Sequence, residues 1–502
     1  MEQYDDIVVG SGVSGLTVAL LLGLNGRKVL LLEKSPSIGG SLRRFYKDGV
    51  PLDAGFHFTG GFGEGGMLSA MLRVLGIAAA IKPQYLHGKN ASQLVLEKEG
   101  KTYEIPIGHT AAIKRLGEYF PNERPAIEEY FNLAKKVCDK TVTMADIRTI
   151  SVNPEPLDED FITLQALFDK IKASPDLQAL FAAYNLCYGV KPQEISFANH
   201  ARVCYNLHEA IARVEGGGEA FIAAFKEQFK KLDITVKCSA FIEKLEDIKE
   251  TYAGKFVLNT GEAIAAQNCI FTLHPKQILE ALPKEHLSKA FISRAESFER
   301  SIGFFSLFGV IDDPKAEDFQ ISVVSLLPEN DFNLLFSPEY KGEPALAIMK
   351  SKEEYQGKTS CVISAFEVSF FEHVARWQNT KLGKRGEDYE EYKRVRIESI
   401  LKRLFAFYPQ YKKRLRVLDV ASQLTFRDYL NSPDGCAYGI KQKIGQYNLF
   451  GKLPIRNIYA AGQSAVLPGI MGAMLASFIV ARAVVGKDKF NAFINKQMDG
   501  KE

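Results

Sequence analysis

The sequence predicts an α/β protein in which two domains are interleaved, and three of its features support this fold class. The chain has 502 residues, whereas one domain usually holds about 100 to 200. Hydrophobic residues make up 46% of it and charged residues 25%, which is typical of a folded protein with ample material for a core. Near the N-terminus, a buried strand, a glycine-rich turn, a helix and a second strand are predicted in succession. This alternation is typical of a parallel sheet covered by helices.

Charge and cysteine usage exclude several classes of function. The chain has 63 Lys and Arg against 60 Asp and Glu, so its net charge of +3 gives no field that attracts nucleic acid. The 7 cysteines include no CxxC pair and the 8 histidines show no metal-ligand spacing. Neither a disulfide framework nor a metal site is therefore expected, and a reducing cytoplasm is the expected compartment.

Membrane insertion is not expected either. The acidic start of the chain, with Glu2, Asp5 and Asp6, is unlike a signal peptide. No stretch offers about 20 uninterrupted apolar residues, the length that crossing a bilayer needs. Any membrane contact is expected to be peripheral.

A β-α-β unit is predicted at the N-terminus. Residues 6–9 and 28–32 are short apolar runs, typical of buried parallel strands. Residues 13–24 between them are expected to form a helix that Asn25-Gly26 ends. This order matches the first unit of a Rossmann-type domain.

The turn of this unit carries the GxGxxG spacing of a dinucleotide-binding site. Gly10 permits the tight turn, Gly12 lets the backbone approach a pyrophosphate, and Gly15 lets the helix pack closely on the strand. Ser14 lies in the first helical turn, where free N–H groups and the positive dipole end would face phosphates. Glu33 follows Gly15 by eighteen residues, the place of an acid that binds a ribose.

A second glycine pair follows the acid. The run contains Lys34, Gly39, Gly40, Ser41, Arg43 and Arg44. It resembles the GG-containing loop of the FAD-binding amine oxidase and phytoene desaturase superfamily, in which the loop contacts the pyrophosphate and the ribityl chain. The resemblance implies FAD as the cofactor. Either arginine could pair with phosphate oxygens, and a solvated basic turn is the alternative.

Two further segments widen this resemblance. Residues 49–61 (GVPLDAGFHFTGG) look like the LDAGFH stretch of the phytoene desaturase family, particularly its branch with retinol saturase and carotenoid isomerase, where the chain leaves the cofactor domain beside the flavin. Residues 213–245 resemble the return to that domain. The alignment places Ile242 where the backbone meets the adenine, and a plain helix-strand hairpin is the alternative.

The C-terminal region resembles the flavin-closing motif of the superfamily. A strand is expected to end at Gly462-Gln463, and an apolar helix to open around Gly469, Ile470 and Gly472. In the family the turn contacts the ribityl and pyrophosphate groups, and the helix start points at the flavin. Free N–H groups there stabilise the negative charge of a reduced flavin. Gln463 replaces the acid of many relatives, a form seen in the saturase-like branch.

The resemblance also implies a domain division. A discontinuous Rossmann-type FAD-binding domain is expected over 1–75, 205–275 and 415–502. An α+β substrate-binding domain is expected over 76–204 and 276–414. In the latter, the helical spacing of apolar residues over 389–405 predicts an amphipathic helix that packs on its own domain rather than on a membrane or a partner.

His57 and Tyr438 are the predicted catalytic residues. The flavin would do the redox work, so the protein must position a C–C bond and handle a proton. A histidine can act near neutral pH, and packing against the flavin is the alternative for His57. For Tyr438, positioning is favoured over acid catalysis. Cys436 could tether FAD covalently, although a buried structural cysteine is favoured.

The implied function is an FAD-dependent oxidoreductase acting on CH–CH bonds of a polyene or isoprenoid-like lipid. A saturase of the retinol 13,14-reductase type is preferred to a desaturase. A carotenoid cis-trans isomerase and an amine oxidase are alternatives, and a GDI-like prenyl-lipid escort is the alternative of another class. The electron donor stays open: NAD(P)H could bind transiently, or a redox protein or quinone could serve.

Overall fold

Five parallel strands form the centre of the first sheet. The computed structural model describes residues 1–63, 65–88, 91–141, 146–150 and 155–500. In spatial order the five strands are β9 (Thr235–Cys238), β2 (Val29–Glu33), β1 (Glu2–Val9), β12 (Ala263–Phe271) and β19 (Ile458–Ala460). Antiparallel strands extend this sheet: β11 (Tyr252–Leu258), β10 (Ile242–Lys249) and β18 (Gly451–Lys452).

Helices and loops cover both faces of this sheet, which explains why its central strands are continuous apolar runs. One face packs on α1 (Val13–Leu24), α2 (Met67–Val74), α9 (Gly218–Lys231), α16 (Gly469–Val485) and α17 (Lys487–Asp499). The other face packs on α10 (Pro275–Ala281) and α11 (Lys289–Ser297), and side chains of β10 and β11 belong to the same apolar cluster. The predicted helix over 13–24 coincides with α1. The strand predicted over 6–9 lies within the longer β1, and the strand predicted over 28–32 is displaced by one residue from β2.

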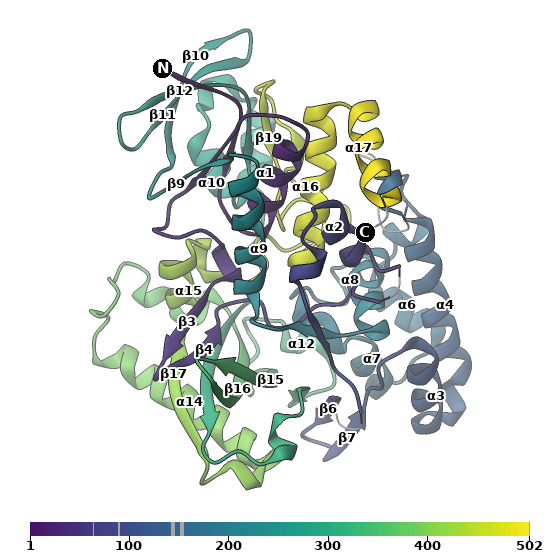
Figure 1. The fold of residues 1–502 in the computed structure, drawn as a ribbon. Helices are drawn as coiled ribbons and strands as arrows, with labels where there is room; N and C mark the ends of the chain where they lie inside the picture. The colour runs from purple at the N-terminus through teal and green to yellow at the C-terminus, as the bar shows by residue number, and fades with distance from the viewer. Residues whose placement is uncertain (64, 89–90, 142–145, 151–154, 501–502) are drawn as a thin grey trace.

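A second sheet of seven strands lies below the first in Figure 1. Its order is β17 (Leu415–Ala421), β13 (Gly303–Ile311), β16 (Lys358–Ser369), β15 (Leu346–Tyr355), β14 (Ser322–Leu327), β6 (Ser92–Leu96) and β7 (Lys101–Glu104). All neighbours are antiparallel except β14 and β6. Two small ribbons pair β3 (Arg44–Lys47) with β4 (Val50–Asp53), and β5 (Pro83–Tyr85) with β8 (Ala212–Val214).

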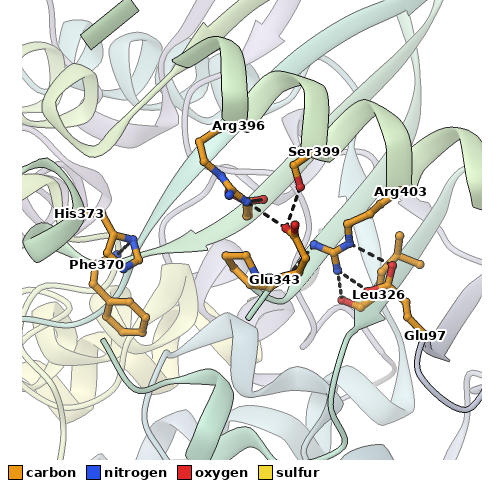
Figure 2. A network of polar contacts seen from close by, with 10 residues as sticks. Glu97, Leu326, Glu343, Phe370, His373, Arg396, Ser399 and Arg403 are labelled. Atoms are coloured by element: carbon orange, nitrogen blue, oxygen red, sulfur yellow. Dashed lines mark hydrogen bonds and ion pairs between the residues drawn. The ribbon is translucent and has the colours of Figure 1, made fainter. Parts of the chain in front are cut away.

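The long helix α14 (Glu387–Phe407) covers the second sheet, with Ile400 and Leu404 in a shared apolar cluster. Figure 2 shows the polar contacts that fasten it. Arg403 donates to Glu97 at 2.6 Å and to the Leu326 carbonyl at 3.2 Å, and Ser399 donates to Glu343 at 2.7 Å. Other short helices accompany this sheet: α12 (Phe332–Leu335), α13 (Phe371–Val374) and α15 (Gln423–Leu430).

Helices line the remaining side of the molecule (Figure 1) and share one apolar cluster. They are α3 (His109–Tyr119), α4 (Arg124–Lys140), α6 (Leu164–Ile171), α7 (Pro175–Phe181), the 3-10 helix η6 (Ala183–Cys187) and α8 (Phe197–Glu209). Within the described residues, no helix combines the length and apolar character needed to span a bilayer.

The α/β fold class is confirmed, with a Rossmann-type sheet beside a second α+β unit. The domain boundaries themselves stay a prediction. One strand bears on them: β17, which begins at residue 415, pairs with β13 of the second sheet. We therefore propose that the last segment of the cofactor domain begins after residue 421.

Candidate cofactor and substrate site

Two helix N-termini open at one edge of the first sheet. Because β1, β2, β12 and β19 are parallel, their carboxyl ends share that edge. The helix α1 follows β1 and α16 follows β19, so both helices begin there. Each start presents unpaired N–H groups and a positive dipole end. The edge is therefore suited to an anionic ligand such as a pyrophosphate.

Four glycines shape these helix starts, and two of them leave open space. Gly10 has a φ of +95°, and a Cβ on Gly15 would lie 1.8 Å from the Gly10 carbonyl oxygen, so both are required by the turn itself. Gly12 differs, because a Cβ there would meet no atom within 4 Å. The same holds for Gly469 at the start of α16. Open space at both positions fits the approach of a ligand to the backbone.

Glu33 is buried at the end of β2 and is fully engaged by local donors. Its carboxylate accepts the Ser11 backbone N–H at 3.0 Å, the Ser11 hydroxyl at 2.5 Å and the Ser35 N–H at 2.7 Å. The Ala240 N–H donates to the Glu33 carbonyl at 2.9 Å. The structure therefore brings Glu33 within two residues of Ile242, the buried first residue of β10.

The second glycine pair lies against the first motif. The Gly39 N–H donates to the Ser11 carbonyl at 3.0 Å, and a Cβ on Gly40 would lie 3.1 Å from the Gly12 Cα. Arg43 braces this loop by donating to the Gly40 carbonyl at 3.1 Å. Lys34 and Ser41 are exposed beside it.

At the other helix start, Gly462 has a φ of +113° and Gln463 donates weakly to the Ala437 carbonyl at 3.4 Å. A Cβ on Gly472 would lie 2.2 Å from the Leu467 carbonyl oxygen, so Gly472 is needed for the turn before α16. Ile470, in the first turn of α16, is partly buried against the cluster of the first sheet.

The Ser14 side chain joins the two helices. Its hydroxyl lies 2.7 Å from that of Ser477 on α16. Ser14 is thus buried between α1 and α16, and its backbone, rather than its hydroxyl, is available at the helix start.

His57 and Tyr438 lie at the two ends of one aromatic row, whose middle members, Phe366 and Phe304, belong to the second sheet. The His57 ring centroid is 4.3 Å from Phe366, Phe366 is 6.2 Å from Phe304, and Phe304 is 6.2 Å from Tyr438. Each of these four side chains keeps some accessible surface. Yet burial dominates the pKa of both His57 and Tyr438. The row is therefore an apolar wall of partly accessible rings, which suits a hydrophobic ligand.

The structure makes His57 a neutral imidazole. Burial lowers its pKa to about 4, and the nearby Asp53 only partly counteracts this effect. Its Nδ1 is buried without a hydrogen-bond partner. At neutral pH the ring is therefore suited to packing and hydrogen bonding rather than to donating a proton.

We expect this burial to make stability depend on pH. An unfolded histidine binds a proton near pH 6.5, whereas folded His57 does so only near pH 4, so its contribution is complete above pH 6.5 and is lost as the pH falls to 4. His57→Gln should make the free energy of unfolding less dependent on pH in this window, and the slope should fall by at most about 1.4 kcal/mol per pH unit. Denaturant unfolding at several pH values measures this slope. An unchanged slope would show that His57 is not buried as a neutral ring.

Tyr438 and Cys436 approach the site from the segment before β18. The Tyr438 hydroxyl donates to the Leu186 carbonyl at 2.7 Å, and burial raises its pKa well above the usual value. Cys436 is buried, with its sulfur 3.4 Å from the Ser432 hydroxyl, and burial raises its pKa too.

Sequence reasoning missed a buried group of four charges where the two small ribbons meet strand β15 of the second sheet. Arg44 contacts Asp53 and Glu353, each at 2.5 Å, and Arg213 contacts them at 2.8 and 2.5 Å. Arg213 also donates to the His57 carbonyl at 3.1 Å. Arg44, considered above as a phosphate ligand, is therefore committed to this quartet. Asp53 and Arg213 lie inside the recognised motifs, but Glu353 carries no local signal.

This fold and site define a two-domain protein with a Rossmann-type dinucleotide-binding unit. The family described as "NAD(P)-binding Rossmann-like domain" matches residues 8–75. Over 98% of its length the chain is 24% identical to the all-trans-retinol 13,14-reductase of Macaca fascicularis, covering 87% of that protein. It is 32% identical to prolycopene isomerase 1 of an Oncidium hybrid cultivar, over 27% of this chain and 23% of that protein.

A solved structure agrees with this fold. Cyclohexylamine oxidase from Brevibacterium oxydans superposes with a TM-score of 0.61 at 14% identity, over 99% of this chain and 100% of that one. Taken with the similarity along the whole sequence, this confirms the predicted resemblance to the phytoene desaturase, carotenoid isomerase and retinol saturase-like proteins.

Proposed function

We propose that this chain is an FAD-dependent oxidoreductase that reduces a C=C bond of a polyene or isoprenoid-like lipid. The observation that carries the proposal is the pairing of open helix starts at Gly12 and Gly469 with an aromatic wall on the facing sheet. The full-length similarity to all-trans-retinol 13,14-reductases supports the saturating direction over desaturation.

The residues present fit FAD. We propose that Gly10, Gly12, Gly15 and the start of α1 hold the pyrophosphate, and that Glu33 and Ile242 lie at the adenosine end. On the flavin side, we propose that the start of α16 contacts the cofactor, together with Gly462, Gln463, Gly469, Ile470 and Gly472. Between the adenosine and flavin ends, the proposed contacts come from the second glycine loop, with Lys34, Gly39, Gly40, Ser41 and Arg43, and from Ser14 in α1. When bound, FAD supplies hydride chemistry.

The aromatic wall would hold the substrate. Phe304 and Phe366 offer an apolar surface that excludes water from a polyene. His57, neutral and packed on Phe366, is proposed as a positioning group whose backbone Arg213 fixes. Tyr438 is proposed to close the wall by anchoring to Leu186.

Tyr438→Phe separates positioning from acid catalysis. If the hydroxyl only anchors the ring, kcat should fall by less than about 10-fold, whereas loss of a general acid costs about 100-fold to 10,000-fold. The measurement is the steady-state rate with saturating polyene. A loss of 100-fold or more with normal FAD content would assign Tyr438 a proton-transfer role.

The products of anaerobic turnover test the reaction class. With reductant and polyenes, a reductase gives a product that has gained two hydrogens. A product of unchanged mass with altered geometry would instead assign isomerisation, which the local similarity to prolycopene isomerase keeps as the second candidate. Purified protein that is colourless and releases no FAD on denaturation would favour a lipid carrier and overturn the proposal.

The electron donor and the cellular location are further parts of this proposal. We propose a donor that binds transiently, either NAD(P)H or a redox protein, and bleaching of the flavin on anaerobic addition of NADPH would identify the former. Cytoplasmic location and peripheral membrane contact stay predictions.

A further inference from the structure

The C-terminal turn of α15 contacts the loops at the cofactor edge of the first sheet. The side-chain amide of Asn431 donates to the Ser35 hydroxyl at 3.2 Å, and the Asn431 carbonyl accepts from the Gln277 side chain at 3.0 Å. Two residues earlier, the Tyr429 carbonyl accepts from Arg43 at 2.8 Å. These bonds join residues that are 154 to 396 positions apart, so they are tertiary contacts rather than parts of a local turn.

The loops that Asn431 joins flank the first glycine turn. Ser35 follows β2, and Gln277 lies in α10, which follows β12. The strand β1 lies between β2 and β12 and runs parallel to both. Asn431 therefore connects the two loops on either side of the turn in which Gly12 leaves open space.

The loop after β2 is held to α15 at both of its ends. It carries the second glycine pair, which we propose to lie along the cofactor. At its far end, the Arg43 Nε donates to the Gly40 carbonyl at 3.1 Å, while its terminal nitrogen donates to Tyr429. At its near end, Ser35 accepts from Asn431.

The helix α15 is itself fixed to the second sheet, and Figure 1 shows it between the two sheets. Its Leu424 is fully buried. The Gln423 side chain accepts from Ser369 of β16 at 3.2 Å. Asp428 pairs with Arg385, whose side chain is only 3% exposed. The contacts at the end of α15 thus tie the cofactor loop to a firm support.

Asn431 suits this place for two reasons. It ends α15 with a φ of +53°, in the left-handed region that glycine and asparagine adopt most readily. Glycine would meet this backbone requirement equally well. Asparagine adds the side-chain bond to Ser35, which glycine cannot make.

We propose that Asn431 is a positioning residue that holds the loop after β2 closed over bound FAD and so slows FAD release. This inference rests on the proposed function and deepens it, because it names what retains the cofactor. For FAD to leave from between the two loops, the bond between Asn431 and Ser35 has to open. A variant without this bond opens more readily and loses FAD faster.

Release of FAD tests the proposal without turnover. The loaded protein is diluted, and the rise of flavin fluorescence gives the rate of release. Asn431→Gly keeps the left-handed backbone and the carbonyl that Gln277 contacts, and it should speed release by about 3-fold to 10-fold, as one neutral hydrogen bond implies. Ser35→Ala removes the same bond from the other side and should have the same effect. The double variant should be no faster than either single variant, because all three lack one shared bond.

Lys172→Gly is the matched control. Lys172 also ends a helix, α6, in the left-handed region, with a φ of +55°, and this variant should release FAD at the wild-type rate. A merely structural role for Asn431 would lower the free energy of unfolding and leave FAD release from the folded protein unchanged. That result, or multiplied effects in the double variant, would overturn the role of Asn431 alone. Wild-type apoprotein that binds no FAD would overturn the proposed function with it.

Discussion

Gly12→Ala is expected to weaken FAD binding by about 100-fold while the fold stays intact. The Gly12 φ of −63° suits any residue, and the added Cβ would meet no protein atom within 4 Å. The methyl group would therefore enter only the space into which the pyrophosphate is proposed to fit. Forcing one carbon into a close contact costs about 1–3 kcal/mol, which corresponds to about 5-fold to 150-fold in affinity, and the rigid backbone beside the pyrophosphate places this change near the upper end. The measurement is the Kd of apoprotein for FAD.

Gly117→Ala is the matched control for this prediction. Gly117 lies in α3, away from the sheet edge, and its nearest neighbour would be the flexible side chain of Arg124 at 3.4 Å. This variant should bind FAD as the wild type does. Wild-type affinity in Gly12→Ala would show that the pyrophosphate does not pass over the start of α1.

Arg213→Met is expected to destabilise the protein by about 3–5 kcal/mol. The change leaves Asp53 and Glu353 buried with only Arg44 to balance them, and breaking a buried ion network from one side has this cost. Burial alone would raise the pKa of Asp53, but Arg213 and Arg44 hold this pKa below its usual value. With Arg213 absent, protonation relieves the excess charge, so the loss should be smaller at pH 5 than at pH 8. Urea unfolding at both pH values measures it.

The exposed pair of Arg394 and Glu391 on α14 supplies the control. Its side chains are 62% and 55% exposed, so Arg394→Met should change stability by less than about 1 kcal/mol. If Arg213→Met were equally mild, the quartet would not stabilise the packing of the two small ribbons on the second sheet. The FAD content of the folded fraction of Arg213→Met shows whether the substitution also weakens cofactor binding.

Local signals made the cofactor half predictable. Helix α1 is bounded by a glycine turn and by Asn25-Gly26, so its limits follow from the sequence alone. Gly12 and Glu33 have their roles encoded by spacing within one β-α-β unit. The amphipathic helix over 389–405 was predicted for the same reason, and α14 indeed packs on its own sheet.

Long-range partners were not predictable. Arg44 meets Glu353 across 309 positions of the chain, and no local pattern records such a pairing. The parallel pairing of β6 with β14 joins Ser92 to Val323, which are also far apart in the sequence. Residues that act through distant partners therefore needed the structure.

A single-turnover reaction tests the central claim most directly. The FAD-loaded protein is fully reduced without oxygen and mixed with one equivalent of all-trans-retinol. The account predicts that the spectrum of oxidised flavin returns and that the recovered retinoid has gained two hydrogens. A flavin that stays reduced beside unchanged retinoid, in protein that binds the polyene, would contradict it.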